Sequence, residues 1–186
     1  MPTLPPLDPA FGYLIIGSAA LLFAVAGGHK LRSLAAFAEV FAAYRVLPES
    51  AARRLARLVP CLEFAIALAL LWPPGRRAAL AAASALLAAY AAALGLNLLR
   101  GRRELDCGCG AAGDRRPIAA WMVWRNVLLM LALGIAAAPW GARPFGAADL
   151  ATIIGGLIAL AVLYAAVDKL LGDVAPRTMA FSRGTS

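Results

Sequence analysis

The run AALAAASALLAAYAAALGLNLL, residues 78–99, carries no charged side chain over 22 residues. A helix needs about 20 consecutive apolar residues to cross the hydrocarbon core of a bilayer, so this run predicts a transmembrane helix. Four further apolar stretches approach that length, at about 11–28, 57–73, 118–138 and 149–167. Only 15% of the chain is charged, whereas a soluble domain carries about 25%. The sequence therefore predicts an all-α membrane protein, a bundle of four to five transmembrane helices.

These spans leave no room for a separate soluble domain. The prediction is one polytopic helical domain over residues 1–167, followed by a polar tail over 168–186. Within residues 78–99, alanine recurs every four residues, at Ala81, Ala85, Ala89 and Ala93. Small side chains at this spacing let transmembrane helices approach closely, so this stripe is predicted to face a neighbouring helix.

The segment between the first two spans has the pattern of an amphipathic helix. Its apolar side chains recur at helical spacing, at Leu31, Leu34, Phe37, Phe41 and Tyr44. Lys30, Glu39 and Arg45 fall on or near the opposite face, and Pro48 ends the run. We predict a helix over about 31–46 that lies on the membrane surface or over the mouth of the bundle. The alternative is a helical extension of the first span.

The basic residues are distributed unevenly between the two sides of the predicted bundle. The net charge is +8, but the Lys and Arg residues lie in connections between spans, which favours contact with anionic lipid over nucleic-acid binding. With five spans, 14 of the 18 Lys and Arg residues lie on the side of the first and third connections, and three lie on the other side. The positive-inside rule places the side with 14 in the cytoplasm.

The third connection contains the stretch ELDCGCGAAGD, residues 104–114, with Cys107 and Cys109. A disulfide across one intervening residue closes a small, strained ring, and strained disulfides are more oxidising than structural ones. Gly108 and Gly110 let the backbone bend. The arginines around the pair favour thiolate over thiol, and Glu104 and Asp106 partly oppose this effect. The pattern indicates thiol–disulfide exchange. Two alternatives stay open: a soft-metal site completed by other ligands, and two cysteines without a shared role.

Polar side chains in and near the spans gather on the same half of the bundle as the cysteine pair. They are His29, Glu63, Arg100, Arg125 and Asn126, with Cys61 as a candidate third thiol or, together with His29, a candidate metal ligand. Charges within a membrane usually pair or line a cavity. Glu63 and Arg125 lie at similar depths, on the order of 10 Å in at about 1.5 Å per residue. We therefore predict a Glu63–Arg125 pair under the cysteine loop, which is either purely structural or lines a polar pocket that serves the thiols.

Five motifs occur in order along the chain: GGHKL (27–31), YRVLP (44–48), VPCLEFAIALALL (59–71), NLLRGRRELDCGCG (97–110) and WRNVLLMLAL (124–133). Together they resemble MauE, within the wider MauE/DoxX group of redox-associated membrane proteins. The resemblance implies a four-helix core that assists a periplasmic thioredoxin-like partner. It implies, as the client, the disulfide-rich small subunit of methylamine dehydrogenase. It also implies periplasmic thiols, whereas the charge distribution predicts cytoplasmic ones.

The resulting prediction is a multi-pass protein of the bacterial cytoplasmic (inner) membrane that acts as a thiol–disulfide oxidoreductase on a thioredoxin-like partner and its client. If electrons leave Cys107 and Cys109, a quinone in the bilayer is the expected acceptor, with its head group near Arg125. No other cofactor and no metal is predicted. One alternative is a non-catalytic assembly factor braced by the cysteine pair. Another is a small metal or solute transporter, which would need more intramembrane polar residues than this chain has.

Overall fold

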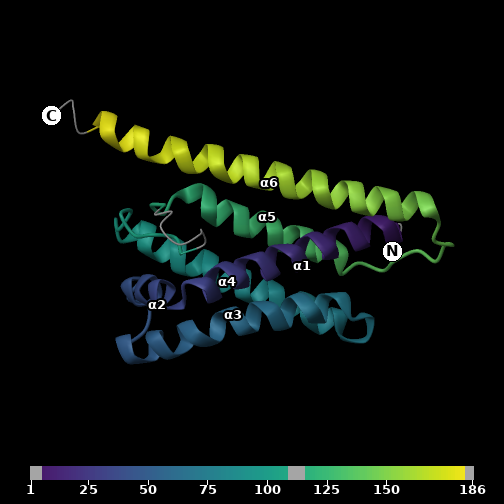
Figure 1. Cartoon of the computed structure of the whole chain (residues 1–186), viewed down its shortest axis with the longest axis horizontal. Coiled ribbons are helices and arrows are strands. Elements are labelled where there is room, and N and C mark those ends of the chain that lie inside the picture. The colour runs from purple at the N-terminus through teal and green to yellow at the C-terminus, as the bar shows by residue number, and fades with distance from the viewer. Residues whose placement is uncertain (1–5, 109–115, 183–186) are drawn as a thin grey trace, which may run out of the picture.

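The computed structural model describes residues 6–108 and 116–182, with side chains up to residue 171. Every regular element assigned in these ranges is a helix. The elements are α1 (Pro9–Arg32), α2 (Leu34–Ala43), α3 (Glu49–Leu71), the short 3-10 helix η1 (Pro73–Gly75), α4 (Arg76–Leu99), α5 (Ala120–Ala136) and α6 (Ala147–Ser182). The long helices run roughly along one axis, and α2 lies at one end of the bundle (Figure 1).

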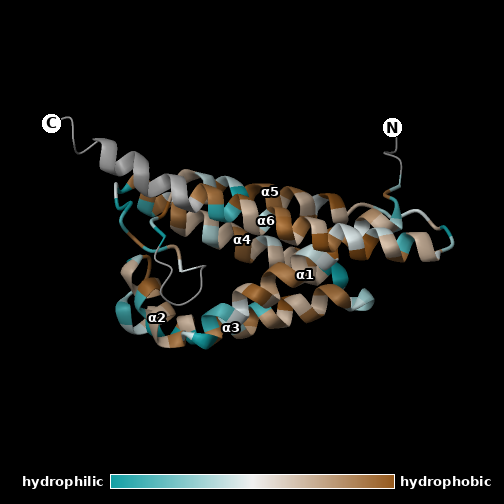
Figure 2. Ribbon diagram, turned by 45° about the horizontal axis from the view of Figure 1, so that its top comes forward, coloured by the Kyte–Doolittle hydropathy of each residue, from teal (hydrophilic) through white to brown (hydrophobic). Residues whose placement is uncertain are grey.

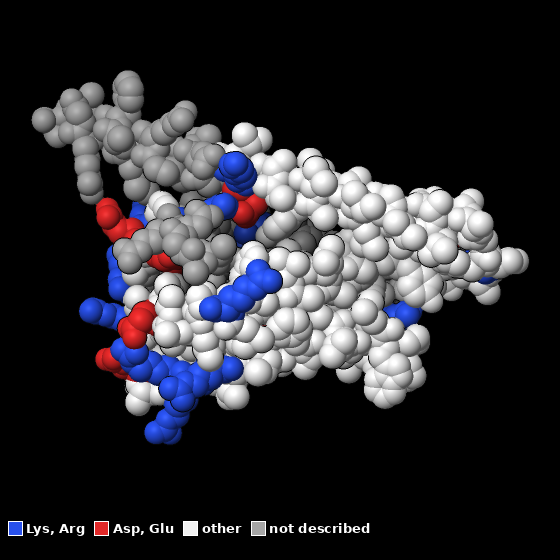
Figure 3. Space-filling model, in the orientation of Figure 1, with Lys and Arg blue, Asp and Glu red and all other residues white. Residues whose placement is uncertain are grey.

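Among the described residues, three helical stretches are long and apolar enough to cross a membrane: Pro9–Arg32, Pro73–Leu99 and Ala147–Leu171. Helix α5 is apolar but has 17 residues, and α3 has 23 residues but carries Arg53, Arg54 and Arg57 in its first half. Apolar residues extend along the bundle (Figure 2), and charged side chains crowd at the end where α2 lies (Figure 3). The chain is an all-α membrane protein, which confirms the prediction.

Four helices form the core of the bundle. Helix α1 packs on α3, α4 packs on α5, and their buried side chains join in one apolar cluster. Its larger members are Ile16, Phe23, Ile66, Leu70, Leu80, Leu87 and Leu133. The α1–α3 contact is close at Gly27, where an added Cβ would lie 3.2 Å from the carbonyl oxygen of Pro60. Helix α6 packs on α1 and lies outside this core (Figure 1).

Most of the alanine stripe expected to face a neighbouring helix points outward instead, and only its last member, Ala93, is half-buried. Ala81, Ala85 and Ala89 are exposed. Helix α4 buries a different face, which carries Ala79, Leu80, Ala83, Leu87, Ala91, Leu94 and Asn97. An alanine-rich helix contains several alanine series with four-residue spacing. The leucines decide which side is buried, because their volume is needed to fill the core.

The connection between the first two predicted spans is more helical than expected. Helix α1 continues to Arg32, α2 follows as the separate helix that was predicted, and α3 begins at Glu49. Arg53 of α3 donates to Glu39 of α2 over 3.1 Å and to Glu49 over 2.9 Å, which ties α2 to α3. At the C-terminal side, α6 runs to Ser182 and so occupies most of the range expected as a tail.

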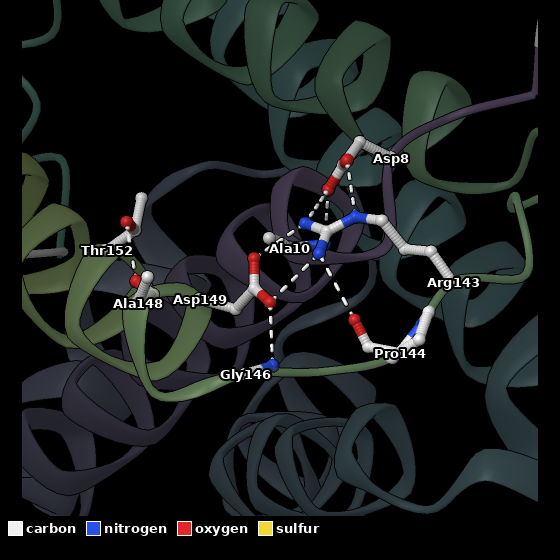
Figure 4. Close-up of polar contacts among 8 residues, drawn as sticks. All are labelled: Asp8, Ala10, Arg143, Pro144, Gly146, Ala148, Asp149 and Thr152. Carbon is white, nitrogen blue, oxygen red and sulfur yellow. Dashed lines mark hydrogen bonds and ion pairs between the residues drawn. The ribbon is translucent and has the colours of Figure 1, made fainter.

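The end of the bundle opposite α2 is closed by a three-residue charge cluster (Figure 4). Arg143 lies between two carboxylates, with its Nε 2.8 Å from Asp8 Oδ2 and its Nη2 2.6 Å from Asp149 Oδ1. The guanidinium lowers the pKa of Asp8, because its hydrogen bond favours the charged carboxylate. The cluster joins the start of α1 to the start of α6.

Trp140 packs beside this cluster, against Gly12 of α1. Its indole Nε1 donates to the carbonyl oxygen of Ala136 over 3.0 Å, and its ring meets Tyr13 edge-on with centroids 5.0 Å apart. The Arg76 guanidinium lies 4.6 Å from its ring centroid. An added Cβ at Gly12 would lie 2.6 Å from two atoms of this ring. Because the ring is held on three sides, it cannot move away at low cost.

We predict that Gly12→Ala lowers the free energy of unfolding by about 1–3 kcal/mol, the usual cost of overpacking a filled site. Thermal unfolding in detergent micelles measures the change. Gly155→Ala is the matched control on α6, since an added Cβ there meets nothing within 4 Å. Equal unfolding temperatures for the two variants would contradict the proposed role of Gly12.

Candidate functional site

The cysteine loop connects α4 to α5 and begins and ends in a short antiparallel bridge between Asp106 and Pro117. The backbone N–H of Cys107 donates to the carbonyl oxygen of Arg116 over 3.0 Å, and that of Ile118 donates to Leu105 over 2.9 Å. Cys109, the second predicted thiol, lies outside the described residues. The bridge restrains the backbone of Cys107, because its N–H is bonded to Arg116 and the second hydrogen bond of the bridge, from Ile118 to Leu105, lies just before it in the chain.

Gly108 makes a turn that a residue with a side chain would strain. Its φ is +67°, and its N–H donates to Oδ1 of Asp106 over 3.1 Å. An added Cβ would lie 3.0 Å from Cγ1 of Val40 and 3.5 Å from Cδ2 of Phe37, both on α2. Helix α2 therefore packs directly on the turn between the two cysteines, and only glycine fits both the conformation and the space.

Cys107 is half-buried at the edge of a second, smaller apolar cluster. The buried members of that cluster are Tyr44, Leu94, Ile118 and Met122, from the end of α2, the end of α4 and the start of α5. The Cys107 side chain thus lies where three helices and the loop meet, at the surface of the charged end of the bundle.

Arginines before the cysteines hold the end of α2. Arg102 donates to the carbonyl oxygens of Ala43 over 2.8 Å and Tyr44 over 3.3 Å, and to Oδ1 of Asn97 over 2.9 Å. Arg100 donates to the carbonyl oxygen of Arg45 over 3.4 Å. A cation at the C-terminus of a helix satisfies its last carbonyls and its negative dipole end. The loop and α2 are therefore fixed to each other by charge as well as by the Gly108 contact.

A buried ion pair lies deeper in the bundle, between α1 and α3. Lys30 Nζ is 2.5 Å from Glu63 Oε1, and the two residues are 4% and 0% exposed. The Tyr90 hydroxyl of α4 donates to the same oxygen over 2.8 Å. The Lys30 ammonium also lies 5.5 Å from the ring centroid of Phe37, the residue against which Gly108 packs. The Lys30–Glu63 pair, the Phe37 ring and the Gly108 turn therefore form a continuous series of contacts from the core to the cysteine loop. We call this series the column.

The predicted Glu63–Arg125 pair is not formed, because Glu63 binds Lys30 and Tyr90. Arg125 of α5 instead donates to Oδ1 of Asp168 on α6 over 3.0 Å. Arg116, at the end of the cysteine loop, pairs with the other oxygen of the same carboxylate. Since α3 packs on α1 and α4, its inward carboxylate faces those helices rather than α5. Asp168 therefore joins α6 to the cysteine loop. The sequence prediction missed this role because it assigned Asp168 to the polar tail.

The remaining predicted residues lie apart from this column. Asn126 is buried on α5, 3% exposed. His29 accepts a hydrogen bond from Ser33 through its backbone carbonyl, over 3.1 Å. Cys61 is exposed on α3, and its thiol points to the carbonyl oxygen of Arg57 at 3.9 Å. Within residues 6–108 and 116–171, no three His, Cys, Asp or Glu side chains group in a way that could hold a metal ion.

Comparison with known proteins identifies relatives along most of the chain. The family model described as "Methylamine utilisation protein MauE" matches residues 8–139. The methylamine utilization protein MauE of Paracoccus denitrificans is 41% identical over 157 residues, 83% of each chain. That of Methylophilus methylotrophus is 33% identical over 171 residues, 89% of this chain and 88% of the relative. No solved structure matches. These matches confirm the resemblance predicted from the five motifs.

We predict that Lys30→Met or Glu63→Gln alone lowers the free energy of unfolding by about 3–5 kcal/mol, because each leaves a buried charge without its partner. The double variant removes both charges, so its free energy of unfolding should lie closer to that of the wild type than either single variant's. The amide oxygen that Glu63→Gln introduces still accepts the Tyr90 hydrogen bond. Thermal unfolding in detergent micelles measures all three.

Arg53→Gln serves as the control, since it removes only exposed ion pairs, those with Glu39 and Glu49, which solvent screens. If the stability lost in the Lys30→Met/Glu63→Gln double variant equals the sum of the two single losses, the two side chains are not coupled.

Proposed function

The chain belongs to the MauE family, and we propose that it is the membrane component of a thiol–disulfide system that matures a client protein in methylamine utilisation. Family membership supports the role in that pathway. The redox chemistry rests on Cys107 and Cys109. A thioredoxin-like protein is the proposed direct partner, and the small subunit of methylamine dehydrogenase is the proposed client.

The main support for the proposal is the local structure around Cys107. Its backbone is fixed by the bridge to Arg116, its side chain is half-buried at the protein surface, and Gly108 bends the chain immediately after it. A thiol that exchanges disulfides must be both accessible and held in place. A purely structural cysteine needs neither a position at the protein surface nor the glycine-only turn that brings α2 against the loop.

The proposed reaction transfers two electrons from the partner to the cysteine pair. A partner thiolate attacks one sulfur of a Cys107–Cys109 disulfide, the S–S bond breaks, and a mixed disulfide forms. The second partner thiolate then displaces the cysteine of this chain. The partner leaves with a disulfide, and Cys107 and Cys109 are left as thiols. A membrane quinone is the proposed acceptor of their two electrons and two protons, which regenerates the disulfide and yields the quinol.

The proposal puts the cysteine loop in the periplasm, where disulfides persist. The opposing observation is the gathering of Lys and Arg at this end of the bundle (Figure 3), which the positive-inside rule assigns to the cytoplasm. Several of these cations are engaged within the protein: Lys30 by Glu63, Arg53 by Glu39, and Arg116 by Asp168. A cytoplasmic loop could serve a periplasmic client only through a relay across the bilayer.

We predict that Cys107→Ser abolishes a mixed disulfide with a thioredoxin-like partner whose second active-site cysteine is replaced by serine. The reason is that Cys107→Ser removes both the disulfide and one of its sulfurs. The measurement is non-reducing electrophoresis of membranes quenched with acid, followed by detection of both chains.

Cys61→Ser is the matched control and should leave the adduct at its wild-type level, because Cys61 lies on α3 and not in the cysteine loop. A mixed disulfide that still forms in Cys107→Ser would contradict the exchange mechanism. If client maturation stays intact in Cys107→Ser at equal expression while the unfolding temperature falls, the cysteine pair is a brace and the chain a non-catalytic assembly factor.

A further inference from the structure

A hollow of about 290 Å³ lies between α4 and α5, on the half of the bundle away from the cysteine loop. It is lined by Arg77, Leu80, Ala81, Ser84, Leu133, Gly134 and Ala137. Leu80 and Leu133 belong to the buried core and form its floor. The other lining residues are exposed or half-buried, so the hollow opens on the outer surface of the bundle.

Small residues keep this hollow open. Gly134 is exposed, and an added Cβ there meets nothing within 4 Å. Ala81 and Ala137 at the rim are also exposed and add only a methyl group each. A membrane protein has lipid tails, not water, against such an apolar surface at this depth. A helix, about 10 Å across with its side chains, does not fit a hollow of this volume, whereas one flexible chain does.

Arg77 stands at the polar end of the hollow, one residue into α4. The other two cations of this end are engaged: Arg143 binds Asp8 and Asp149, and Arg76 lies over the rings of Tyr13 and Trp140. Arg77 is exposed and has no hydrogen bond, ion pair or ring contact with the described residues. A long arginine side chain near a helix end reaches toward the head-group layer.

We propose that this hollow is a binding site for one anionic phospholipid, whose phosphate pairs with Arg77 and whose acyl chain fills the space over Leu80 and Leu133. Guanidinium and phosphate match in charge and in geometry, because two parallel N–H groups can donate to two phosphate oxygens. The acyl chain packs on the floor of the hollow and against the exposed small residues of its rim, Ala81, Gly134 and Ala137. Both halves of the site are needed, since the cation selects the head group and the hollow holds the tail.

The experiment counts lipids retained by the full-length protein in mild detergent by native mass spectrometry, with phosphatidylglycerol or phosphatidylcholine added at equal concentrations. The wild type should retain one phosphatidylglycerol in preference to phosphatidylcholine by about fivefold, the factor expected for one cation at an anionic head group. Arg77→Gln should abolish the preference and leave similar retention of both lipids. Gly134→Leu should abolish retention of both, because its side chain fills the hollow.

Two controls keep the test decisive. Gly155→Leu adds the same side chain at another open helix glycine, and Arg54→Gln removes an exposed cation at the opposite end; both should retain lipid as the wild type does. If Gly134→Leu fails to fold, Ala137→Leu fills the same hollow from the residue that caps the C-terminus of α5. Retention of phosphatidylglycerol by the filled variant, or an unchanged preference in Arg77→Gln, would overturn the proposal. An equal loss in Arg54→Gln would do so as well, because it would show attraction to net charge alone.

Discussion

The arrangement of the charged end depends on the ion pair between Lys30 and Glu63. Both groups are out of contact with solvent, and a charge so placed is tolerated only if it is paired and hydrogen-bonded. The pair, with the Tyr90 hydroxyl, fixes α1, α3 and α4 in one relative position. The same ammonium lies against Phe37, and Phe37 supports the turn at Gly108. The position of the cysteine loop therefore follows from a core interaction rather than from the loop alone.

The two ends of the bundle use charge differently. At the far end, Arg143 and its two carboxylates join the segment before α1 to the first turn of α6 (Figure 4). At the cysteine end, Arg102 holds the last carbonyls of α2, and Asp168 holds both Arg116 and Arg125. Each of these contacts restrains an element that touches the cysteine loop. The result is a loop held on the α2 side and on the α6 side, with Cys107 at the surface between them.

Hydropathy was sufficient to predict the helical membrane fold, and the spacing of Phe37 and its apolar neighbours predicted α2. The charged pairs between helices were harder to predict, because the partner of each side chain depends on where each helix ends. Ending the first span at residue 28 left Lys30 in a connection, so Glu63 was assigned the wrong cation. Ending the last span at 167 hid Asp168 as the partner of Arg125. The contact of Arg102 with α2 joins residues almost 60 positions apart, and no local pattern encodes it.

The most direct test of the account is labelling of Cys107 and Cys109 with a membrane-impermeant maleimide in intact cells, in a Cys61→Ser background. Cells are labelled with and without prior reduction by an impermeant phosphine, and again after lysis. A periplasmic, redox-active pair predicts labelling from outside that appears only after reduction. Labelling that needs lysis and no reduction would place reduced thiols in the cytoplasm and contradict disulfide exchange with a periplasmic partner.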